Sequence, residues 1–454
     1  MRRRSLRVLA VLVMCVLIAT GCRGAADTAD SDDAAGGDAA ASPEAGGSEE
    51  AATGELTFAE GVTEEPCPDE VAVNPDNGCI YLGVISDFTG TFAGLGAPIA
   101  EAVGAFWNRV NEQGGIGGFD VDAVTYVRDN NYNPETHNEV YQEIKPEILA
   151  LAMSLGSPTT AAIYDDLEAS SIVTVPAGWT SNYVFQDLVL EYGTSYCVES
   201  MNAVSWATEN VVDDPQTIMA VHYPGDYGAD AAYGAQVAAD DLGAEFVAVE
   251  TEPGQDNQAG AIDAIVSQNP DLVVVTTGPT DVATIIGQAA AQGYQGQYVG
   301  TSPTWNPGLK DTPAFEAMTQ QYHQSRPAET YEEGEGPGFD AVREVFGDDG
   351  DDGILTGWTP QYAVKAAIEA AIDNGDLTRE GLLEAATSLE AVDYEGMQPE
   401  GSGNFAAGEA FPREIIMAQP DAEASSGVTA VTDYISSDVA EGFEFGDQPC
   451  WQQL

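Results

Sequence analysis

The sequence predicts an α/β protein built from two lobes, each with a parallel β-sheet covered by helices. From residue 80 onward, short runs rich in β-branched residues alternate with longer segments of helical periodicity, which is typical of parallel α/β architecture. Several of these runs are continuously apolar, as expected of strands covered on both faces. They are too numerous for one ordinary sheet in a chain of 454 residues, so we expect two lobes.

The strands and helices follow in order along the chain. Predicted strands cover residues 80–85, 121–127, 148–153, 172–175, 218–222, 246–249, 272–275 and 298–300. A helical stripe of apolar residues begins at Ile99 and ends at Gly114 and Gly115, and further helices are expected over 261–266 and 361–372. We place His323 in a helix, and we expect residues 326–353, which are acidic and glycine-rich, to form a long surface excursion.

Charge and composition restrict the class of function. The chain has 75 Asp and Glu against 14 Lys and Arg, a formal net charge of −61. Phosphate backbones require a basic binding surface, so we exclude a nucleic-acid-binding protein. Apolar residues make up 44% of the chain, which is enough to build folded cores.

The first 21 residues have the order of an export signal. Basic residues are followed by an apolar stretch over 8–18 and by small residues before Cys22. The apolar stretch is too short to span a bilayer, and its junction with Cys22 resembles a bacterial lipobox, in which this cysteine carries lipid. An ordinary secretory peptide cut near the same place is the alternative. Residues 22–66, poor in large apolar side chains, are predicted to be a flexible acidic tether.

Four cysteines remain for the folded body: Cys67, Cys79, Cys197 and Cys450. An even number in an exported chain favours two disulfides, and three pairings are possible. The pairing of residues close in sequence is Cys67–Cys79, which leaves Cys197 to pair with Cys450. Zinc is the alternative, but the chain has no Cys-x-x-Cys pair and only three histidines, so we expect neither a metal nor a cofactor.

Several short motifs occur in an order that resembles a known family. They are Leu82-Gly83-Val84-Ile85-Ser86-Asp87-Phe88-Thr89-Gly90, Gly114-Gly115-Ile116-Gly117-Gly118, Val127-Arg128-Asp129-Asn130, Gly156-Ser157-Pro158-Thr159-Thr160, Ala177-Gly178-Trp179-Thr180, Asp226-Tyr227-Gly228 and Asn269-Pro270-Asp271-Leu272-Val273. Each is weak alone, but together they span about residues 80–371. The chain thus resembles the type I periplasmic binding proteins and, within them, is similar to branched-chain amino acid binding proteins of ABC importers.

The resemblance implies two Rossmann-like lobes joined by a hinge of three crossovers, with the ligand in the cleft between them. The N-lobe would hold residues 67–196 plus about 329–390. The C-lobe would hold residues 197–326 plus about 391–454.

The first group of candidate ligand-binding residues follows the predicted strand at 148–153. Ser157 precedes Pro158 and so occupies an expected N-cap position, where its function is either capping or ligand binding. Its hydroxyl, that of Thr159 and the free N–H groups of the helix start would together receive a carboxylate or another acceptor.

Further candidates come from the resemblance. Gly178, Trp179 and Thr180 follow the predicted strand at 172–175, where open α/β sheets place ligand contacts. Family members use the position of Thr180 for the ligand's polar head, and Trp179 would form either a wall of the cleft or a packing contact. Tyr227 would close on the ligand from the second lobe, and Leu95 replaces a residue that is often aromatic.

One departure from the family concerns the ligand's ammonium group. Amino acid binders place an acidic residue after the strand that corresponds to 298–300, whereas this chain has Gly300-Thr301-Ser302-Pro303-Thr304, with Ser302 as the candidate contact. A buried ammonium without a counter-charge is costly. Either Asp226 or Asp281 supplies the charge, or the ligand is not an α-amino acid.

Three functions are compatible with the sequence. The leading hypothesis is a monomeric lipoprotein, anchored outside the cytoplasm, that binds a small polar or amphipathic molecule without chemistry and delivers it to an ABC permease. The second is a sensor that presents its ligand-bound form to a signalling partner in the membrane. The third, an exported hydrolase, is disfavoured because Ser157 lacks a Gly-x-Ser-x-Gly context.

Overall fold

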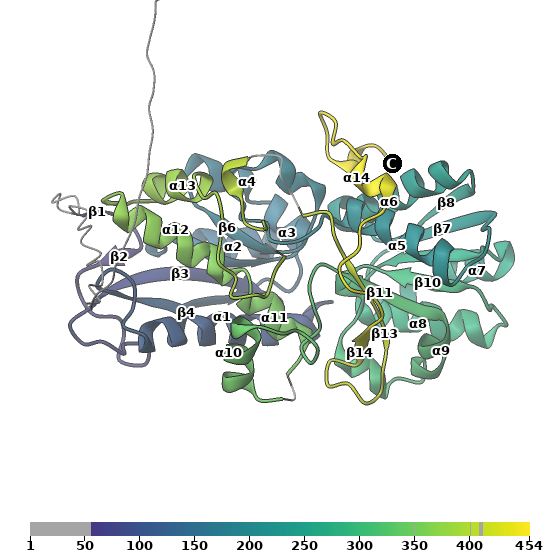
Figure 1. Cartoon of the computed structure of the whole chain (residues 1–454), viewed down its shortest axis with the longest axis horizontal. Helices are drawn as coiled ribbons and strands as arrows, with labels where there is room; N and C mark the ends of the chain where they lie inside the picture. The colour runs from purple at the N-terminus through teal and green to yellow at the C-terminus, as the bar shows by residue number, and fades with distance from the viewer. Residues whose placement is uncertain (1–55, 349, 400, 408–411) are drawn as a thin grey trace, which may run out of the picture. The chain divides into compact units, whose positions relative to one another are not determined.

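The computed structural model describes residues 56–348, 350–399, 401–407 and 412–454 (Figure 1). The export signal, Cys22 and residues 23–55 of the predicted tether lie outside these residues. The prediction of a flexible tether is wrong for residues 56–66, because β1 Thr57–Phe58 pairs with β12 Asp376–Leu377 and β2 Val62–Thr63 pairs with β3 Gly78–Ser86. Among the helices that are described, none is both long and apolar enough to cross a membrane.

The first lobe contains a parallel sheet in the order β4-β3-β5-β6, with a short antiparallel strand, β2, beside β3. The strands of this sheet are β2 Val62–Thr63, β3 Gly78–Ser86, β4 Phe119–Asp129, β5 Ala150–Leu155 and β6 Thr174–Ala177. Both faces are covered, which explains the continuously apolar strands. Helices α1 Ala93–Glu112, α11 Asp352–Trp358 and α12 Gln361–Asp373 pack on one face, and α2 Pro134–Ile144 and α4 Tyr164–Ala169 pack on the other.

The remaining elements of the first lobe lie around this sheet. They are α3 Ser157–Ala161, α10 Pro337–Phe346, α13 Arg379–Thr387 and the paired strands β1 Thr57–Phe58 and β12 Asp376–Leu377.

The second lobe contains a seven-stranded sheet in the order β14-β13-β11-β10-β9-β7-β8, parallel from β11 to β8 and antiparallel at β13 and β14. Its strands are β7 Thr217–His222, β8 Glu245–Glu250, β9 Leu272–Thr276, β10 Gln297–Gly300, β11 Tyr322–Arg326, β13 Ile416–Pro420 and β14 Val428–Ala430. Helices α5 Tyr196–Asn210 and α6 Gly225–Leu242 cover one face, and α7 Ala259–Gln268, α8 Pro279–Ala291 and α9 Phe315–Gln321 cover the other. A short helix, α14 Asp438–Glu441, follows β14 and packs on α5.

The described segments alternate between the lobes, so the chain passes between them three times. We expected the last return to the second lobe at about residue 391, but Tyr394 and Met397 are buried in the first-lobe core. The N–H of Ala406 donates to the carbonyl of Leu389, which also belongs to the first lobe. Residues 391–399 and 401–407 therefore pack with the first lobe, because their apolar side chains fill its core.

The predicted strands from 80–85 to 298–300 are all present, but two predictions about the later sequence are wrong. His323 lies on β11 instead of a helix, because this polar segment pairs with β10 and β13. Residues 326–353 do not form a surface excursion: they include α10, and Tyr331 and Phe339 are buried in the first-lobe core. The local composition did not predict that Tyr331 and Phe339 belong to the core, because glycines and acidic residues separate these two aromatic residues in the sequence.

Both predicted disulfides are present. Cys67–Cys79 joins Cα atoms 4.8 Å apart, and Cys197–Cys450 joins Cα atoms 6.3 Å apart across a sequence separation of 253 residues. The first closes a loop that Asp120 fixes by accepting hydrogen bonds from the N–H groups of Val73 and Asn74, both at 2.8 Å. The second connects the start of α5 to the last residues of the sequence.

Two glycines allow α11 to lie against α1, and this packing shapes the space between the lobes. A Cβ atom on Gly357 would lie 2.2 Å from the carbonyl oxygen of Ile99, and one on Gly353 would lie 2.9 Å from the side chain of Pro98. Neither glycine has a positive φ, so it is the close approach and not the backbone conformation that requires them.

We predict that Gly357→Ala destabilises the protein by about 1–3 kcal/mol, because the added methyl group overlaps the α1 backbone. The matched control is Gly260→Ala on α7, where a Cβ atom would have no neighbour within 4 Å. That control should stabilise the protein by about 0.5–1 kcal/mol through helix propensity. Urea unfolding of both variants measures the difference, and equal stabilities would contradict the close-packing argument.

Candidate ligand-binding site

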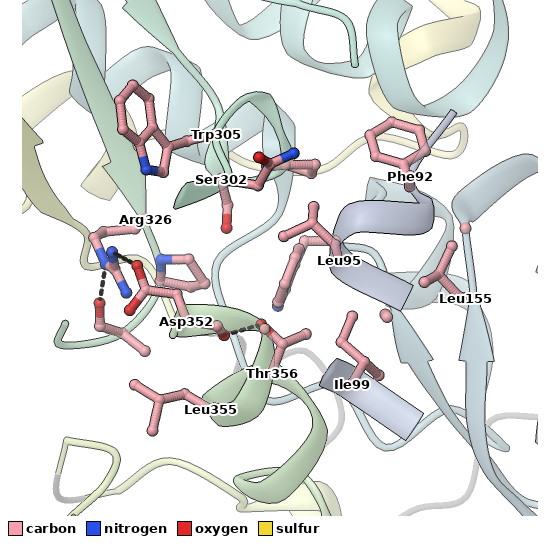
Figure 2. A pocket seen from close by; sticks show the side chains of 18 of the residues that line it. Phe92, Leu95, Ile99, Leu155, Ser302, Trp305, Arg326, Asp352, Leu355 and Thr356 are labelled. Carbon is pink, nitrogen blue, oxygen red and sulfur yellow. Dashed lines mark hydrogen bonds and ion pairs between the residues drawn. The ribbon is translucent and has the colours of Figure 1, made fainter. Parts of the chain in front are cut away.

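The cleft between the lobes lies at the carboxyl ends of both parallel sheets. Loops after β3, β5 and β6 reach it from the first lobe, and loops after β10 and β11 reach it from the second. Open α/β sheets place ligands at such ends, because the loops there converge and leave backbone groups free. Figure 2 shows Phe92, Leu95 and Leu155 on one side of the cleft and Trp305 on the other.

Apolar and aromatic side chains form most of the lining. They are Phe92, Leu95, Ile99, Tyr132, Leu155, Ala177, Trp179, Tyr192, Tyr196, Tyr227, Pro303, Trp305, Pro307, Pro327, Ala328 and Leu355. Such walls remove the apolar part of a ligand from water, which is the main source of affinity in concave sites.

Aromatic rings from the two lobes touch beside the cleft. Phe92 of the first lobe makes an edge contact with Tyr227 of α6 at a centroid distance of 6.2 Å, and Tyr132 packs on Phe92 at 4.6 Å. The Tyr227 hydroxyl donates to the carbonyl of Thr277 at 3.2 Å and lies 3.1 Å from the Thr301 hydroxyl. Tyr227 is therefore fixed within its own lobe and presents its ring to the other one.

Four lining residues carry buried polar atoms that have no hydrogen-bond partner among the described residues. These atoms are Ser157 Oγ, Trp179 Nε1, the Tyr192 hydroxyl oxygen and Gln324 Oε1. The first three can donate, and the fourth can only accept. Because an unpaired buried polar group costs about 1–3 kcal/mol, such a set indicates a place where a ligand's polar group completes the hydrogen bonding.

The prediction that Ser157 is an N-cap is wrong. Gly156 takes the cap position of α3 with φ 101°, and Ser157 is the first helical residue. A Cβ atom on Gly156 would lie 2.6 Å from Thr159 Oγ1, and its positive φ also favours glycine there. The Ser157 hydroxyl is consequently not used for capping and stays available to the cleft.

Five of the eight predicted contacts line the cleft: Leu95, Ser157, Trp179, Tyr227 and Ser302. The other three do not. Thr159 donates its hydroxyl to the carbonyl of Leu155, and Thr180 uses its own to cap the 3-10 helix Ser181–Phe185. Gly178 lies behind Ser157, since a Cβ atom added to this glycine would lie 2.8 Å from Ser157 Oγ.

Among the described residues that line the cleft, Asp352 is the one acid and Arg326 the one base. Their side chains form an ion pair at 2.6 Å that connects β11 of the second lobe to α11 of the first (Figure 2). Arg326 also donates to the carbonyls of Ala328 and Glu329. Its charge is thus balanced and mostly used for joining the lobes, which leaves the cleft without net charge.

Neither acid proposed for the ammonium group lines the cleft. Asp281 accepts hydrogen bonds from the Tyr223 hydroxyl at 2.6 Å and the N–H of Gly254 at 2.7 Å, inside the second lobe. Asp226 accepts from the Asn182 side chain at 2.8 Å. A third acid, Glu199, lies behind Ser302 and accepts from its N–H at 2.8 Å.

Several lining residues escaped sequence reasoning. Three of them, Phe92, Ile99 and Leu355, lie in helices or at a helix start, where their spacing equally fits a role in the core. Two others, Tyr192 and Tyr196, lie in the first crossover, where the chain first passes from the first lobe to the second. Leu355 belongs to a segment that we expected to lie near a surface excursion.

Comparisons with known proteins agree with this architecture. The sequence model of a family described as periplasmic binding protein matches residues 79–427. A fatty acid ABC transporter substrate-binding protein from Thermomonospora curvata is 27% identical with a TM-score of 0.77, over 86% of this chain and 97% of its own. A comparison with curated proteins gave no match.

Two more distant structures share the fold. A branched chain amino acid ABC transporter from Thermus thermophilus with bound valine is 18% identical, with a TM-score of 0.69 over 80% of this chain and 98% of its own. A leucine binding protein from Thermotoga maritima is 16% identical, with a TM-score of 0.66 over 79% of this chain and 99% of its own.

We predict that stability falls between pH 6.5 and pH 8.5. Burial raises the pKa of Asp226 and Asp230 to about 7 each and that of Glu199 to about 8. The folded protein therefore holds protons that the unfolded chain releases, and this contribution is lost as the pH rises through these values. Each group should contribute on the order of 1 kcal/mol, measured by urea unfolding.

Buried histidines oppose this fall at the lower end of the window, because burial lowers the pKa of His137 to about 3 and also lowers the pKa values of His222 and His323. Their effect ends within about one pH unit above the ordinary histidine pKa of about 6.5, so the fall dominates the upper part of the window. Asp226→Asn should reduce the slope, because asparagine keeps the acceptor for Asn182 without titrating. Stability that is constant or rising over this window would contradict the prediction.

Proposed function

Because the chain belongs to the periplasmic binding protein family, we propose that it is the solute-binding component of an ABC importer and that its ligand is an amphipathic molecule with an apolar body and an acceptor head group, such as a carboxylate. Members of this family act outside the cytoplasm, bind small molecules without transforming them and interact with ABC permeases. The observation that carries the ligand proposal is the uncharged, largely apolar cleft with three unpaired donors.

Two features favour a carboxylate or amide without an ammonium group. The donors Ser157, Trp179 and Tyr192 all belong to the first lobe or the first crossover and match a hydrogen-bond acceptor. No acid stands free among the described lining residues, so an ammonium group would be desolvated without a counter-charge. The 27% identity to a substrate-binding protein described as belonging to a fatty acid ABC transporter agrees with this choice.

The proposal extends to the mode of attachment. Cys22 would carry the lipid that anchors a monomeric protein to the membrane, and residues 22–55 would let the folded body move between solution and permease. These parts rest on the sequence alone.

We predict that fatty acids raise the melting temperature and that valine and leucine do not. A ligand present at 100 times its Kd stabilises the native state by about 2.7 kcal/mol, which is a shift of several degrees in a thermal scan. The panel should contain octanoate, palmitate, a fatty amide, valine and leucine, each confirmed by calorimetric titration of delipidated protein. Saturable binding of valine without any binding of fatty acids or the amide would overturn the ligand class and leave family membership intact.

We also predict that Ser157→Ala weakens ligand binding about fivefold, equivalent to about 1 kcal/mol, without destabilising the free protein. The Ser157 hydroxyl has no partner in the structure, so its removal costs the free protein nothing. Thr159→Val is the matched control: it should lower stability through lost hydrogen bonds while leaving the lining of the cleft unchanged. Loss of stability in Ser157→Ala with unchanged binding would show that this hydroxyl is structural.

A further inference from the structure

The last residues of the sequence are fastened to the second lobe. We call residues 437–453 the strap; Figure 1 shows it in yellow beside α5 and α6. Ser437 donates both its N–H and its hydroxyl to Asn202 Oδ1 at 2.8 Å, and Cys450 is bonded to Cys197 at the start of α5. Both sulfurs are buried, in a small apolar cluster with Val198 and Met201.

The far end of the strap reaches the first lobe. The N–H of Cys450 donates to Ser181 Oγ at 2.8 Å, and the Trp451 indole N–H donates to Asn182 Oδ1 at 3.0 Å. Both acceptors belong to the 3-10 helix after β6. This helix is part of the first lobe, because Tyr183 lies in its core and the residues that follow pair with β6 at Thr174.

The same two first-lobe residues are also held by α6 of the second lobe. Ser181 donates its N–H to Asp230 Oδ2 at 3.0 Å and its hydroxyl to Asp230 Oδ1. Asn182 donates its amide to Asp226 at 2.8 Å. The strap therefore completes the hydrogen bonding of residues that already join the lobes: Ser181 Oγ donates to α6 and accepts from the strap, and the Asn182 amide does the same.

This junction lies directly beside the cleft. Trp179, two residues before Ser181, and Tyr227, adjacent to Asp226, both line it. The junction and the Phe92–Tyr227 contact both join the first lobe to α6, so a movement of α6 away from the first lobe would separate Ser181 and Asn182 from α6 and from the strap.

We propose that the strap is a latch that holds the two lobes in their closed arrangement, with the Cys197–Cys450 disulfide as its anchor and Ser181 and Asn182 as its attachment. The proposal concerns lobe closure and does not depend on the identity of the ligand.

The anchor is needed for energetic reasons. The two hydrogen bonds to Ser181 and Asn182 do not offset the conformational entropy that is lost when a free segment of the chain becomes ordered. A tail held by hydrogen bonds alone would leave the first lobe most of the time. The disulfide keeps Cys450 and Trp451 close to their acceptors. The segment has therefore already lost most of its conformational entropy before the lobes close.

The test uses ligand-free full-length protein and two readouts: the radius of gyration from small-angle X-ray scattering, and hydrogen exchange of the Ser181 amide, which donates across the lobes. We expect Cys197→Ser/Cys450→Ser to increase the radius of gyration and to speed exchange of the Ser181 amide about tenfold or more. Trp451→Phe keeps the disulfide and the ring but loses the bond to Asn182, and should speed this exchange about threefold.

Cys67→Ser/Cys79→Ser is the matched control, since it removes the other disulfide within the first lobe and should leave both readouts as in the parent. If Cys197→Ser/Cys450→Ser fails to fold, Trp451→Phe decides. An unchanged Ser181 exchange rate in either folded strap variant overturns the proposal, because the strap then belongs to the second lobe alone. An equal acceleration in the control variant also overturns it, because the effect is then general destabilisation.

Discussion

The structure depends on one topological constraint: two parallel sheets direct the carboxyl ends of their strands at the same cleft while the chain crosses between them three times. Parallel strands require helical crossovers, so both faces of each sheet are buried and only the loops at the strand ends remain for function. Ser157 follows β5, Trp179 follows β6, and Ser302 follows β10. The site is therefore assembled from loops that are distant in sequence but share one edge of their sheets.

The electrostatics of the cleft contrast with those of the whole chain. The sequence carries a net charge of −61, yet the cleft is neutral because Arg326 and Asp352 compensate each other. The acids behind it, Glu199 and Asp226, have pKa values raised by burial and are tied up in hydrogen bonds. The head group of the proposed ligand would thus meet uncharged donors in a local environment that the global field does not determine.

Lobe closure is distributed over several kinds of contact. The Phe92–Tyr227 edge contact is apolar, the Arg326–Asp352 pair is ionic, and the junction at Ser181 and Asn182 is held by hydrogen bonds. Each comes from a different pair of elements. Closure therefore does not rest on ligand contacts alone, and the strap adds a covalently anchored contribution at the side of the cleft where α6 begins.

The sequence by itself determined the α/β class and the buried strands, because burial on both faces leaves continuous apolar runs that can be read locally. It also favoured two disulfides through an even number of cysteines, and its resemblance to a known family pointed to most of the five predicted residues that line the cleft. Only the tertiary structure decided the rest. Gln324, Ser325 and Arg326 form a strand despite their polarity because Ser302, Glu199 and Asp352, all distant in sequence, satisfy their side chains. Thr159 and Thr180 do not line the cleft, because their hydroxyls form hydrogen bonds with the carbonyl of Leu155 and the N–H of Asn182. These hydrogen bonds depend on the positions that the partner groups take in the folded protein, and the local sequence does not predict those positions.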